Sequence, residues 1–418
     1  MLLIMKIQRG FKFRLNVDTE QQDAFWKQAG CNRYVWNAFL RYQESRRKRG
    51  HFVERYENMA NKLTMMKKEV TFLKTDCQSA TLQQTLKDLY RAYQDGFDKK
   101  QPNKRLPKPK KKHSSTNSFR YPAAFKVEGN RVFLPKLGWF TFRKSRDIIG
   151  KIKNVTVSHK GGHWYVSFQT EYERTERPHQ SSSIVGVDLG VKRLATLSSG
   201  HYVQGLDNLR QSQAKLKRLQ RQLAKKVKFS ANWRKIKTKI SRLHTRIANC
   251  RHDFLHKFSS YLSKSHAMIV FEDLNIKGMS RSAKGTLDEP GKMVKQKSGL
   301  NKAILDQGWS MLVDFCKYKQ QWKNGEVIKV PAPGTSQRCS SCGHKDKANR
   351  QSQAQFHCNQ CENKQNADDN ASLNIEAAGH AVLSCGGPAL AGPMKQGSTF
   401  SGNATAITES VQLAFFAS

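Results

Sequence analysis

The chain carries a formal net charge of +42 at pH 7 over 418 residues, since 74 lysines and arginines oppose only 32 aspartates and glutamates. Such a surface repels itself unless a polyanion neutralises it, so nucleic acid is the expected partner, with a ribosomal-type RNA binder and an anionic membrane surface as alternatives. The length allows two or three domains with their own cores, and 10% aromatic residues argue against a merely disordered basic tail.

The cysteines and the apolar runs predict the compartment. Four of the nine cysteines form two CxxC pairs, and the other five are scattered singly at Cys31, Cys77, Cys250, Cys316 and Cys385. That pattern suits a reducing cytosol, where single thiols are usually small apolar residues. No apolar run approaches the roughly 20 residues that a membrane span needs, so we expect a cytoplasmic protein and no membrane partner.

The first elements in the chain are a strand and two helices. Lys6–Leu15 alternates basic and apolar residues, which predicts a strand with one solvated face. Thr19 as N-cap and Gln22 three residues later indicate a capping box, and the helix is expected to end near Arg46–Arg49. A second helix is predicted over about Ser79–Phe97. Its apolar stripe favours a helix–helix core over a base-stacking surface, and comprises Leu82, Leu86, Leu89, Tyr90, Tyr93 and Phe97.

A basic segment follows from Lys104, where six of nine residues are lysine or arginine. Pro107 and Pro109 exclude a helix. A solvated charge run is one interpretation, but phosphate contact is favoured because small polar and aromatic residues follow at once. The predicted nucleic-acid contacts in this region are Lys108, Lys110, Lys111, Lys112, Arg120 and Tyr121.

Residues 125–173 are rich in strand patterns: NRVFLP, LGWFTFR, IKNVTVSHK and HWYVSFQTE. Gly161 and Gly162 join the last two as a hairpin. We expect these strands to pair with the N-terminal strand in one barrel-like domain, into which the helical segment 17–100 is inserted. Residues 173–183 have the composition of a linker.

A different pattern opens at Ser183. A buried-type strand, Ile184–Val187, ends in Asp188 and is followed by two short strands and a long helical hairpin. Between Arg210 and Lys257 the hairpin carries sixteen lysines and arginines against a single acid, Asp253. So basic a hairpin is expected to lie along a phosphate backbone. Its predicted contacts are Arg218, Arg221, Lys225, Arg234 and Lys235.

The remaining elements lead to a cysteine motif. A second apolar strand ends in Glu272, residues 277–300 are predicted to be a mobile loop, and a helix over 301–322 precedes a strand at 327–330. Two CxxC pairs separated by fifteen residues can place four thiolates around one structural Zn²⁺. The predicted zinc ligands are Cys339, Cys342, Cys358 and Cys361.

Three acidic residues mark the candidate chemistry. Asp188 and Glu272 end two buried strands, and Asp368 begins a helix after the cysteine motif. Strand ends converge on one edge of a mixed sheet, and clustered carboxylates repel one another unless cations bind between them. Two Mg²⁺ ions about 4 Å apart are the usual solution. The arrangement predicts hydrolysis of phosphodiesters by a two-metal mechanism.

At this point the residues carry a resemblance. GVDLG around Asp188, FEDLN around Glu272, TSQRCSSCG, FHCNQC and NADDNASLNI resemble the signature motifs of the TnpB (OrfB) family of transposon-encoded RNA-guided DNA endonucleases, which are related to type V CRISPR effectors. The resemblance extends to about residue 378. It implies a RuvC-like, RNase H-type α/β nuclease domain (181–335 and 363–379) interrupted by a zinc ribbon (336–362). It also implies a β-barrel wedge domain (1–16 and 117–180) with a helical recognition insertion (17–116), and we expect a disordered tail over 380–418.

The resemblance also implies roles and partners. Asp188, Glu272 and Asp368 match the three catalytic acids of the family, while Asn366 replaces the first Asp of the usual D-x-D-x-N-A motif and Asp369 is the variable position. The expected partners are a guide RNA from the transposon end and double-stranded target DNA, in the prokaryotic cytosol or nucleoid. A transposase that catalyses strand transfer and a non-catalytic regulator of transposition are the alternatives.

Overall fold

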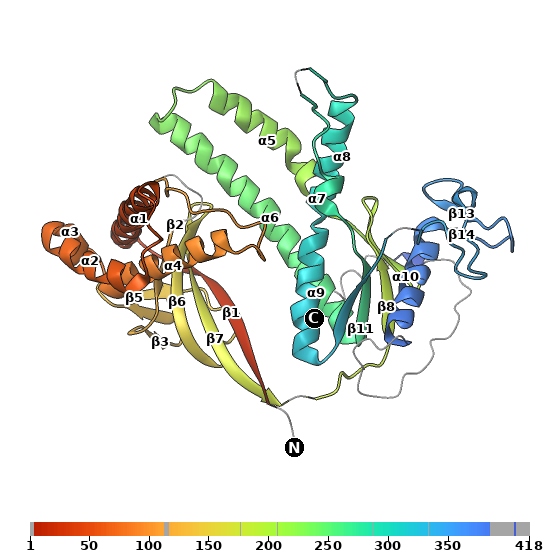
Figure 1. Cartoon of the computed structure of the whole chain (residues 1–418), viewed down its shortest axis with the longest axis horizontal. Helices are drawn as coiled ribbons and strands as arrows, with labels where there is room; N and C mark the ends of the chain where they lie inside the picture. Colours follow the sequence, from red (N-terminus) through yellow and green to blue (C-terminus); the bar gives the residue numbers. More distant parts are fainter. Residues whose placement is uncertain are drawn as a thin grey trace. The chain divides into compact units, whose positions relative to one another are not determined.

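The computed structural model describes residues 4–112, 117–175, 177–206, 208–286, 288–332, 334–384 and 405–406. The chain forms two compact units, Met1–Thr175 with Lys237–Thr245, and Glu176–Ile236 with Arg246–Ser418. Among the described helices, none has the length and apolar character to cross a membrane. Figure 1 labels the elements of both units.

The first unit is built on an antiparallel seven-stranded sheet with the order β2-β6-β7-β1-β5-β4-β3. The long strand β1 pairs with β7 along most of its length and with β5 at its end. The predicted pairing of the N-terminal strand with the later strands is thus confirmed, as is the hairpin turn between β6 and β7. The strands are β1 (Ile4–Asn16), β2 (Asn117–Tyr121), β3 (Lys126–Glu128), β4 (Arg131–Leu134), β5 (Gly138–Phe142), β6 (Lys151–Lys160) and β7 (His163–Thr175).

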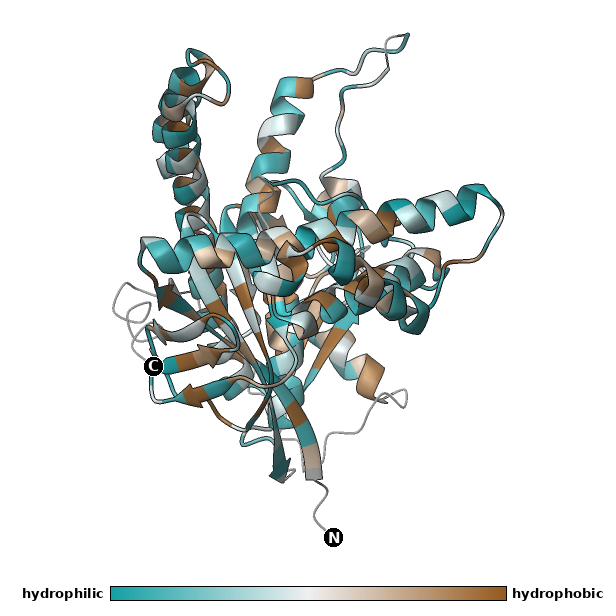
Figure 2. Cartoon of the chain, turned by 90° about the vertical axis from the view of Figure 1, so that its left-hand side faces the viewer, coloured by the Kyte–Doolittle hydropathy of each residue, from teal (hydrophilic) through white to brown (hydrophobic). Residues whose placement is uncertain are grey.

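Alternation along these strands gives the sheet one buried face. Phe11, Phe13 and Leu15 of β1 are buried, whereas Lys12 and Arg14 between them face away from this core. Figure 2 shows hydrophobic and hydrophilic residues alternating along the strands. Successive side chains of a strand point to opposite faces, so the period of two in the sequence is sufficient to place this core.

Four helices lie between β1 and β2 in the chain. They are α1 (Thr19–Lys48), α2 (Tyr56–Glu69), α3 (Phe72–Thr75) and α4 (Ser79–Phe97). Leu82, Leu86 and Leu89 of α4 are fully buried in a cluster with Phe39 and Leu40 of α1, which confirms the predicted helix–helix core. Phe97, the last residue of the predicted stripe, is 51% exposed and does not belong to this core. The helices α2 and α3 were not predicted, because their segment lacks a long apolar period.

The start of α1 differs from the prediction by one residue. The N-cap is Asp18, whose carboxylate accepts a hydrogen bond from the backbone N–H of Gln21 at 2.8 Å. The Gln21 side chain accepts in return from the Asp18 N–H at 3.2 Å, which completes the capping box. The assignment of Thr19 and Gln22 to these roles was therefore wrong. Asp18 with Gln21 and Thr19 with Gln22 are both suitable pairs of side chains three residues apart. Only the residue at which the backbone becomes helical distinguishes them.

Two of the cysteines that were predicted to be single thiols form a disulfide. Cys31 of α1 and Cys77, just before α4, are joined by a disulfide, and both are buried in the helical core of the first unit. Cys250 and Cys316 are free. The prediction that Cys31 and Cys77 are isolated was wrong because they are 46 residues apart in sequence and meet only when α1 packs against α4.

The second unit is built on a mixed sheet with the order β12-β11-β8-β9-β10-β15. Strand β11 lies between β8 and β12 and is parallel to both, whereas β9 is antiparallel to β8 and β10. The predicted strands ending in Asp188 and Glu272 are confirmed. The strands are β8 (Ile184–Asp188), β9 (Arg193–Leu197), β10 (His201–Gln204), β11 (Met268–Glu272), β12 (Glu326–Val330) and β15 (Thr405–Ala406).

Helices cover both faces of this sheet. Helices α6 and α9 pack on one face in a cluster with Val185, Val187 and Phe271, and α10 packs on the other with Met268 and Val270. The helices are α5 (Asn208–Ala224), α6 (Ala231–Ser265), α7 (Ile276–Met279), α8 (Val294–Gln307), α9 (Trp309–Lys323) and α10 (Ala367–Ser384). Figure 1 draws α5 and α6 as the predicted hairpin.

Two predictions in this unit need correction. Residues 277–300 are not a continuous loop, because α8 already begins at Val294, and the helix predicted over 301–322 is divided at Gly308 into α8 and α9. Gly308 has φ of +74°, a left-handed conformation that interrupts the helical hydrogen bonds. The expectation of a disordered tail over 380–418 was wrong for residues 380–384, which belong to α10, and for 405–406, which form β15. The rest of that tail, apart from 405–406, lies outside the described residues.

Candidate active site and metal centre

The two buried strands place their terminal carboxylates on the same face of the sheet. Val187 of β8 lies opposite Phe271 of β11 in parallel register, and both contribute to the core beneath α6 and α9. The next residues, Asp188 and Glu272, therefore point to the opposite face, beside each other at the strand ends. Because both strands run parallel, both carboxylates reach the same edge.

That face is the one covered by α10. A Cβ at Gly186, two residues before Asp188, would lie 2.2 Å from the backbone oxygen of Ser372 in α10. Only glycine allows the helix to approach β8 this closely. The close approach brings the first turn of α10, with Asp368, to the ends of β8 and β11.

The start of α10 explains the departure at Asn366. This residue immediately precedes the helix, and its side-chain oxygen accepts a hydrogen bond from the backbone N–H of Asp368 at 2.9 Å. Asn366 thus serves as an N-cap, a position at which asparagine and aspartate are both strongly favoured. An amide can replace a carboxylate here without loss of the cap. The Asp368 carboxylate lies in the first turn of the helix.

In the structure, Asp188 lies close enough to Glu272 and Asp368 for their charges to affect its pKa. Burial, followed by the negative charges of Glu272 and Asp368, raises the pKa of Asp188 to about 7. Burial also raises the pKa of Glu272. A carboxylate in this setting is stabilised by a positive charge placed among the three, so the donor set suits a hard divalent cation with oxygen ligands.

Two residues beside the acids were missed by the sequence analysis. The Arg350 charge lowers the pKa of both Asp188 and Glu272, which places its guanidinium near the cluster. The hydroxyl of Thr335 donates a hydrogen bond to a carboxylate oxygen of Glu272. Arg350 lies in the segment between the two CxxC pairs, where no periodicity or motif distinguishes it from its many basic or polar neighbours in sequence. The only indication for Thr335 in the sequence was its place as the first residue of the motif TSQRCSSCG.

The four cysteines form a separate centre. Their sulfur atoms all lie within 4.8 Å of one another, and 3.6 Å separates Cys339 from Cys361 and Cys342 from Cys358. Four thiolates about 2.3 Å from one tetrahedral ion would be about 3.8 Å apart. The spacing therefore fits a tetrahedral metal ion, and the predicted grouping of these residues is confirmed.

The two CxxC turns share one backbone pattern. The Cys339 N–H donates to the oxygen of His344 at 2.8 Å, and the Cys358 N–H donates to the oxygen of Asn363 at 3.0 Å. Burial raises the pKa of Cys339, but backbone N–H groups directed at its sulfur outweigh that effect and lower the pKa to about 6. A thiol of low pKa is already in the form that binds metal. Strands β13 (Gln355–His357) and β14 (Lys364–Asn366) complete this small subdomain.

Two asparagines of α10 attach the cysteine turns to the helix that carries Asp368. Asn370 is fully buried, and its side chain accepts from the Ser340 N–H at 2.9 Å and donates to the Arg338 oxygen at 2.8 Å. Asn374, one turn later, donates to the oxygens of Arg338 and Thr335 at 2.7 and 2.9 Å. The helix that presents Asp368 is thereby held to the segment that presents Thr335.

Asp369 forms an ion pair with a residue outside the acidic cluster. Its carboxylate lies 3.5 Å from the guanidinium of Arg193 on β9, and the Arg193 guanidinium covers the ring of Tyr202 at 3.9 Å. Burial raises the pKa of Asp369, and Arg193 lowers it. The pair therefore attaches the first turn of α10 to β9.

Replacing Arg193 with methionine should destabilise the second unit by about 1–3 kcal/mol, because Asp369 would keep its partly buried charge without a partner. The double variant Arg193→Met with Asp369→Asn should recover part of that loss. Urea denaturation of the two single variants and the double variant measures the coupling. Strictly additive effects would show that the two side chains are independent.

The basic segment before β2 is tied to α1 by its backbone. The indole N–H of Trp36 donates to the Lys108 oxygen at 3.1 Å, and Asn37 exchanges two hydrogen bonds with the backbone of Lys110 at 2.8 and 2.9 Å. The ammonium of Lys110 lies 3.7 Å from the centre of the Trp36 ring, and desolvation lowers its pKa to about 8. Lys108, Lys111 and Lys112 are exposed, and their contact with phosphates stays a prediction.

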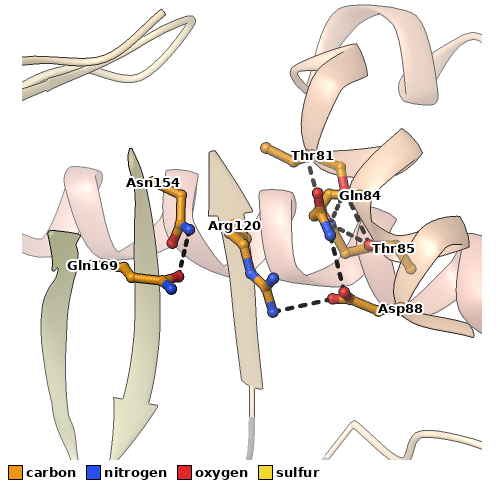
Figure 3. A network of polar contacts seen from close by, with 8 residues as sticks. Thr81, Gln84, Thr85, Asp88, Arg120, Asn154 and Gln169 are labelled. Atoms are coloured by element: carbon orange, nitrogen blue, oxygen red, sulfur yellow. Dashed lines mark hydrogen bonds and ion pairs between the residues drawn. The ribbon is translucent and has the colours of Figure 1, made fainter. Parts of the chain in front are cut away.

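The structure separates the two predicted contacts on β2. Arg120 forms an ion pair with Asp88 of α4, with 3.5 Å between Nη2 and Oδ2, and Gln84 donates to the same carboxylate (Figure 3). Tyr121 is fully buried in the sheet core, with its hydroxyl 3.4 Å from the Pro135 oxygen. A ring in that position cannot stack on a base, so the prediction that Tyr121 contacts nucleic acid was wrong. Arg120 and Tyr121 are neighbours on β2, so their side chains point to opposite faces of the sheet, and that of Tyr121 points into the core.

On the basic hairpin, the predicted contact residues are all exposed. Leu219 of α5 and Ile247 of α6 are buried, so the apolar stripe of the hairpin faces inward and its charges face solvent. Binding of nucleic acid by these charges stays a prediction. The residues are Arg218, Arg221, Lys225, Arg234 and Lys235.

Three family models match the chain. One described as a probable transposase matches residues 167–283, one described as a Cas12f1-like TNB domain matches residues 309–375, and one described as a helix-turn-helix domain matches residues 5–51. In the structure, that last range comprises β1 and the single helix α1. The first two ranges contain Asp188, Glu272, Asp368 and the four cysteines.

Relatives and a solved structure agree with these matches. The chain is 48% identical over 407 residues to "Putative RNA-guided DNA endonuclease InsQ" of Escherichia coli K12, which covers 96% of this chain and 100% of the relative. It is 30% identical over 394 residues to a "Putative RNA-guided DNA endonuclease" of Streptomyces pristinaespiralis, covering 92% of each. The fold is similar to that of Cas12f1 in its complex with sgRNA and target DNA, with a TM-score of 0.54 and 13% identity over 89% of this chain and 99% of the other.

The identity of 48% over the whole length of a relative is far above the level at which families diverge in fold, and the matched models agree with it. The chain therefore belongs to the TnpB (OrfB) family of transposon-encoded RNA-guided DNA endonucleases.

Proposed function

We propose that this protein is an RNA-guided DNA endonuclease of a transposable element, and that it hydrolyses phosphodiesters at Asp188, Glu272 and Asp368. The observation that supports this most directly is the electrostatic interaction of Asp188, at the end of β8, with Glu272 at the end of β11 and Asp368 in the first turn of α10. A carboxyl whose pKa is raised to about 7 by burial and by the charges of Glu272 and Asp368 is an unfavourable arrangement for stability alone. The RNA-guided endonuclease names of the relatives supply the substrate class.

The three carboxylates would hold divalent cations, which we propose are two Mg²⁺ ions. Held by these residues, such ions would supply activation of water and charge neutralisation at the leaving 3′-oxygen. Thr335 orients the Glu272 carboxylate through its hydrogen bond, and the Asn366 cap fixes the turn that presents Asp368. Arg350 provides a positive charge beside the acids, where it would bind the phosphate that is cut.

We propose that the four cysteines bind one structural Zn²⁺, since tetrahedral thiolate sites favour that ion. The subdomain has a core of only Cys339, Phe356, Cys358 and Ala367, too small for stability without a metal. Its function in this proposal is to hold Arg350 and Thr335 beside the acids.

The domain assignments extend the same proposal. Residues 181–335 and 363–379 would be the RuvC-like, RNase H-type nuclease domain, and 336–362 the zinc ribbon inserted in it. The sheet of the first unit would be the wedge domain (1–16 and 117–180), and α1–α4 the recognition insertion (17–116). Support comes from the fold similarity to Cas12f1 and from the helical insertion between β1 and β2.

The charge of +42 is explained in this proposal by a guide RNA and a double-stranded DNA target. The guide would come from the transposon end and pair with the target strand, so that the protein itself reads only a short adjacent motif and duplex shape. Such partners place the protein in the prokaryotic cytosol or nucleoid.

The function is tested with protein purified together with its bound RNA. We expect Mg²⁺-dependent cutting of DNA that matches the guide and carries the adjacent motif, and no cutting of unmatched DNA. Sequencing of the bound RNA supplies the guide from which the matched DNA is made. Removal of the RNA by ribonuclease should abolish cutting. Equal cutting of matched and unmatched DNA, or cutting without RNA, contradicts the proposal.

Strand transfer is the second candidate, because one matched family model is described as a probable transposase and nuclease folds of this type host several chemistries. The same assay separates the two. Hydrolysis leaves free 3′-hydroxyl and 5′-phosphate ends, whereas strand transfer joins the cut 3′ end to a second DNA, which gives a longer labelled product on a denaturing gel.

A further inference from the structure

The turn between α5 and α6 is apolar at its tip, although the hairpin around it is strongly basic. Val227 and Phe229 are 79% and 54% exposed. Lys225, Lys226 and Lys228 flank them and are exposed too. Isolated exposed apolar residues are ordinary, but two of them at the end of a projecting, positively charged hairpin are not explained by packing in the described structure.

The conformation of Phe229 is unusual for an aromatic residue. Its φ is +70°, in the left-handed region that bulky residues rarely occupy and where glycine or asparagine is the ordinary choice. The hairpin therefore retains a phenyl ring at a position where a smaller residue would form the turn more easily. Such backbone strain is concentrated at functional positions.

The ring is held by its neighbours in a fixed orientation. Phe229 meets the indole of Trp233 edge to face, with 5.4 Å between centroids and an angle of 61°. The backbone N–H of Trp233 donates to the hydroxyl of Ser230, the N-cap of α6, at 3.2 Å. The Lys228 ammonium lies 5.3 Å from the phenyl centroid. A preorganised ring of this kind loses little freedom when a flat partner stacks on it.

The charge pattern identifies the partner. Besides the three lysines, Arg234 and Lys235 follow in the first turns of α6, so the ring is surrounded by cations within about ten residues of chain. A partner that offers both flat apolar faces and closely spaced negative charges is a nucleic acid with unpaired bases. A regular duplex is a poor fit, because its bases are already stacked on one another. Unpaired bases that are present before any target is met belong to loops of a folded RNA.

We propose that the α5–α6 tip is a stacking platform for an unpaired base of the guide RNA. Phe229 stacks on the base, and Lys225, Lys226 and Lys228 contact the phosphates on either side of it. The proposal rests on the proposed function for the identity of the RNA, and it assigns to the hairpin a contact beyond attraction to a phosphate backbone.

The variant Phe229→Gly separates binding from folding. Glycine relieves the left-handed strain, so the melting temperature should be unchanged or higher, whereas loss of the ring should raise the Kd for the guide RNA about 10- to 100-fold. Phe229→Tyr should retain wild-type affinity. The matched control is Phe52→Ala, since Phe52 is 93% exposed but lies between α1 and α2, and its Kd should not change. Affinities are measured at one fixed salt concentration.

Abasic substitution in the guide RNA locates the base. Each unpaired nucleotide is replaced in turn by an abasic one. At one position the wild type should lose the same 10- to 100-fold, while Phe229→Gly loses nothing further. Unchanged binding by Phe229→Gly, or equal loss on a fully paired RNA, overturns the proposal. So does a loss on single-stranded DNA or phosphatidylserine vesicles without a loss on guide RNA.

Failure of this proposal and failure of the proposed function are distinguishable. At saturating guide RNA, Phe229→Gly should cut matched DNA at the wild-type rate, because the tip is not part of the acidic cluster. If the wild type binds RNA through Phe229 but cuts nothing, the nuclease proposal fails and the stacking platform stands. If the wild type cuts matched DNA and Phe229→Gly binds the guide RNA normally, the stacking platform fails and the nuclease proposal stands.

Discussion

Asp188→Asn is expected to abolish DNA cutting and, at the same time, to raise the melting temperature of the metal-free protein at pH 8. The Asp188 carboxyl has a pKa of about 7 in the folded protein, against 3.8 ordinarily, because it is buried beside Glu272 and Asp368. The unfolded chain loses this proton near pH 4 and the folded chain near pH 7. The ionised carboxylate therefore destabilises the fold increasingly between these values, and fully above pH 7.

The amide removes that cost but also removes a metal ligand. We expect cutting to fall by at least about 10²- to 10³-fold. The gain in melting temperature should be about 2–4 °C for each kcal/mol recovered in a unit of this size. Melting curves in EDTA measure it, and below about pH 3 the difference should largely disappear because the wild-type carboxyl is then mostly protonated in both states.

Asp314→Asn is the matched control for this experiment. Asp314 is an exposed residue of α9, so the same change in formal charge should leave both the melting temperature and cutting as they are. Identical melting curves of Asp188→Asn and wild type at pH 8 would contradict the electrostatic account. Wild-type cutting by Asp188→Asn would contradict the assignment of the active site.

Cys358→Ser should remove the bound zinc and reduce cutting by about 10²-fold while α1–α4 and their sheet stay folded. Cys358 is fully buried in the four-residue core of the cysteine subdomain, and its thiolate cannot be replaced by a neutral hydroxyl. Without the ion, the segment that carries Arg350 loses its structure. The acids themselves would stay on β8 and β11.

Metal analysis should find one zinc per wild-type chain and none in Cys358→Ser. Limited proteolysis should cut the variant between residues 336 and 362 and spare the wild type. Cys250→Ser is the matched control, because Cys250 is a free, exposed thiol outside the cluster, and it should keep both zinc and activity. Full zinc content or wild-type cutting in Cys358→Ser would contradict the structural role of the site.

The local elements could be predicted from the sequence where a pattern repeats along the chain. Short continuous apolar runs placed β8 and β11 and put Asp188 and Glu272 at their ends, and the 3.6-residue period placed α4 with its buried leucines. The CxxC spacing predicted which four sulfurs meet. Each of these inferences depends on neighbours within a few residues, which the sequence contains directly.

The tertiary structure alone decided contacts between distant segments. Arg350 and Thr335 reach the acids because Asn370 and Asn374 hold the cysteine subdomain to α10, and no local pattern encodes that attachment. Tyr121 is buried because β2 pairs with β6, which turns its ring inward. The sequence by itself therefore determined the ligand types and the elements that present them. Packing of elements far apart in the chain determined which charges surround them and which aromatic rings remain exposed, because burial and electrostatics depend on distance in space.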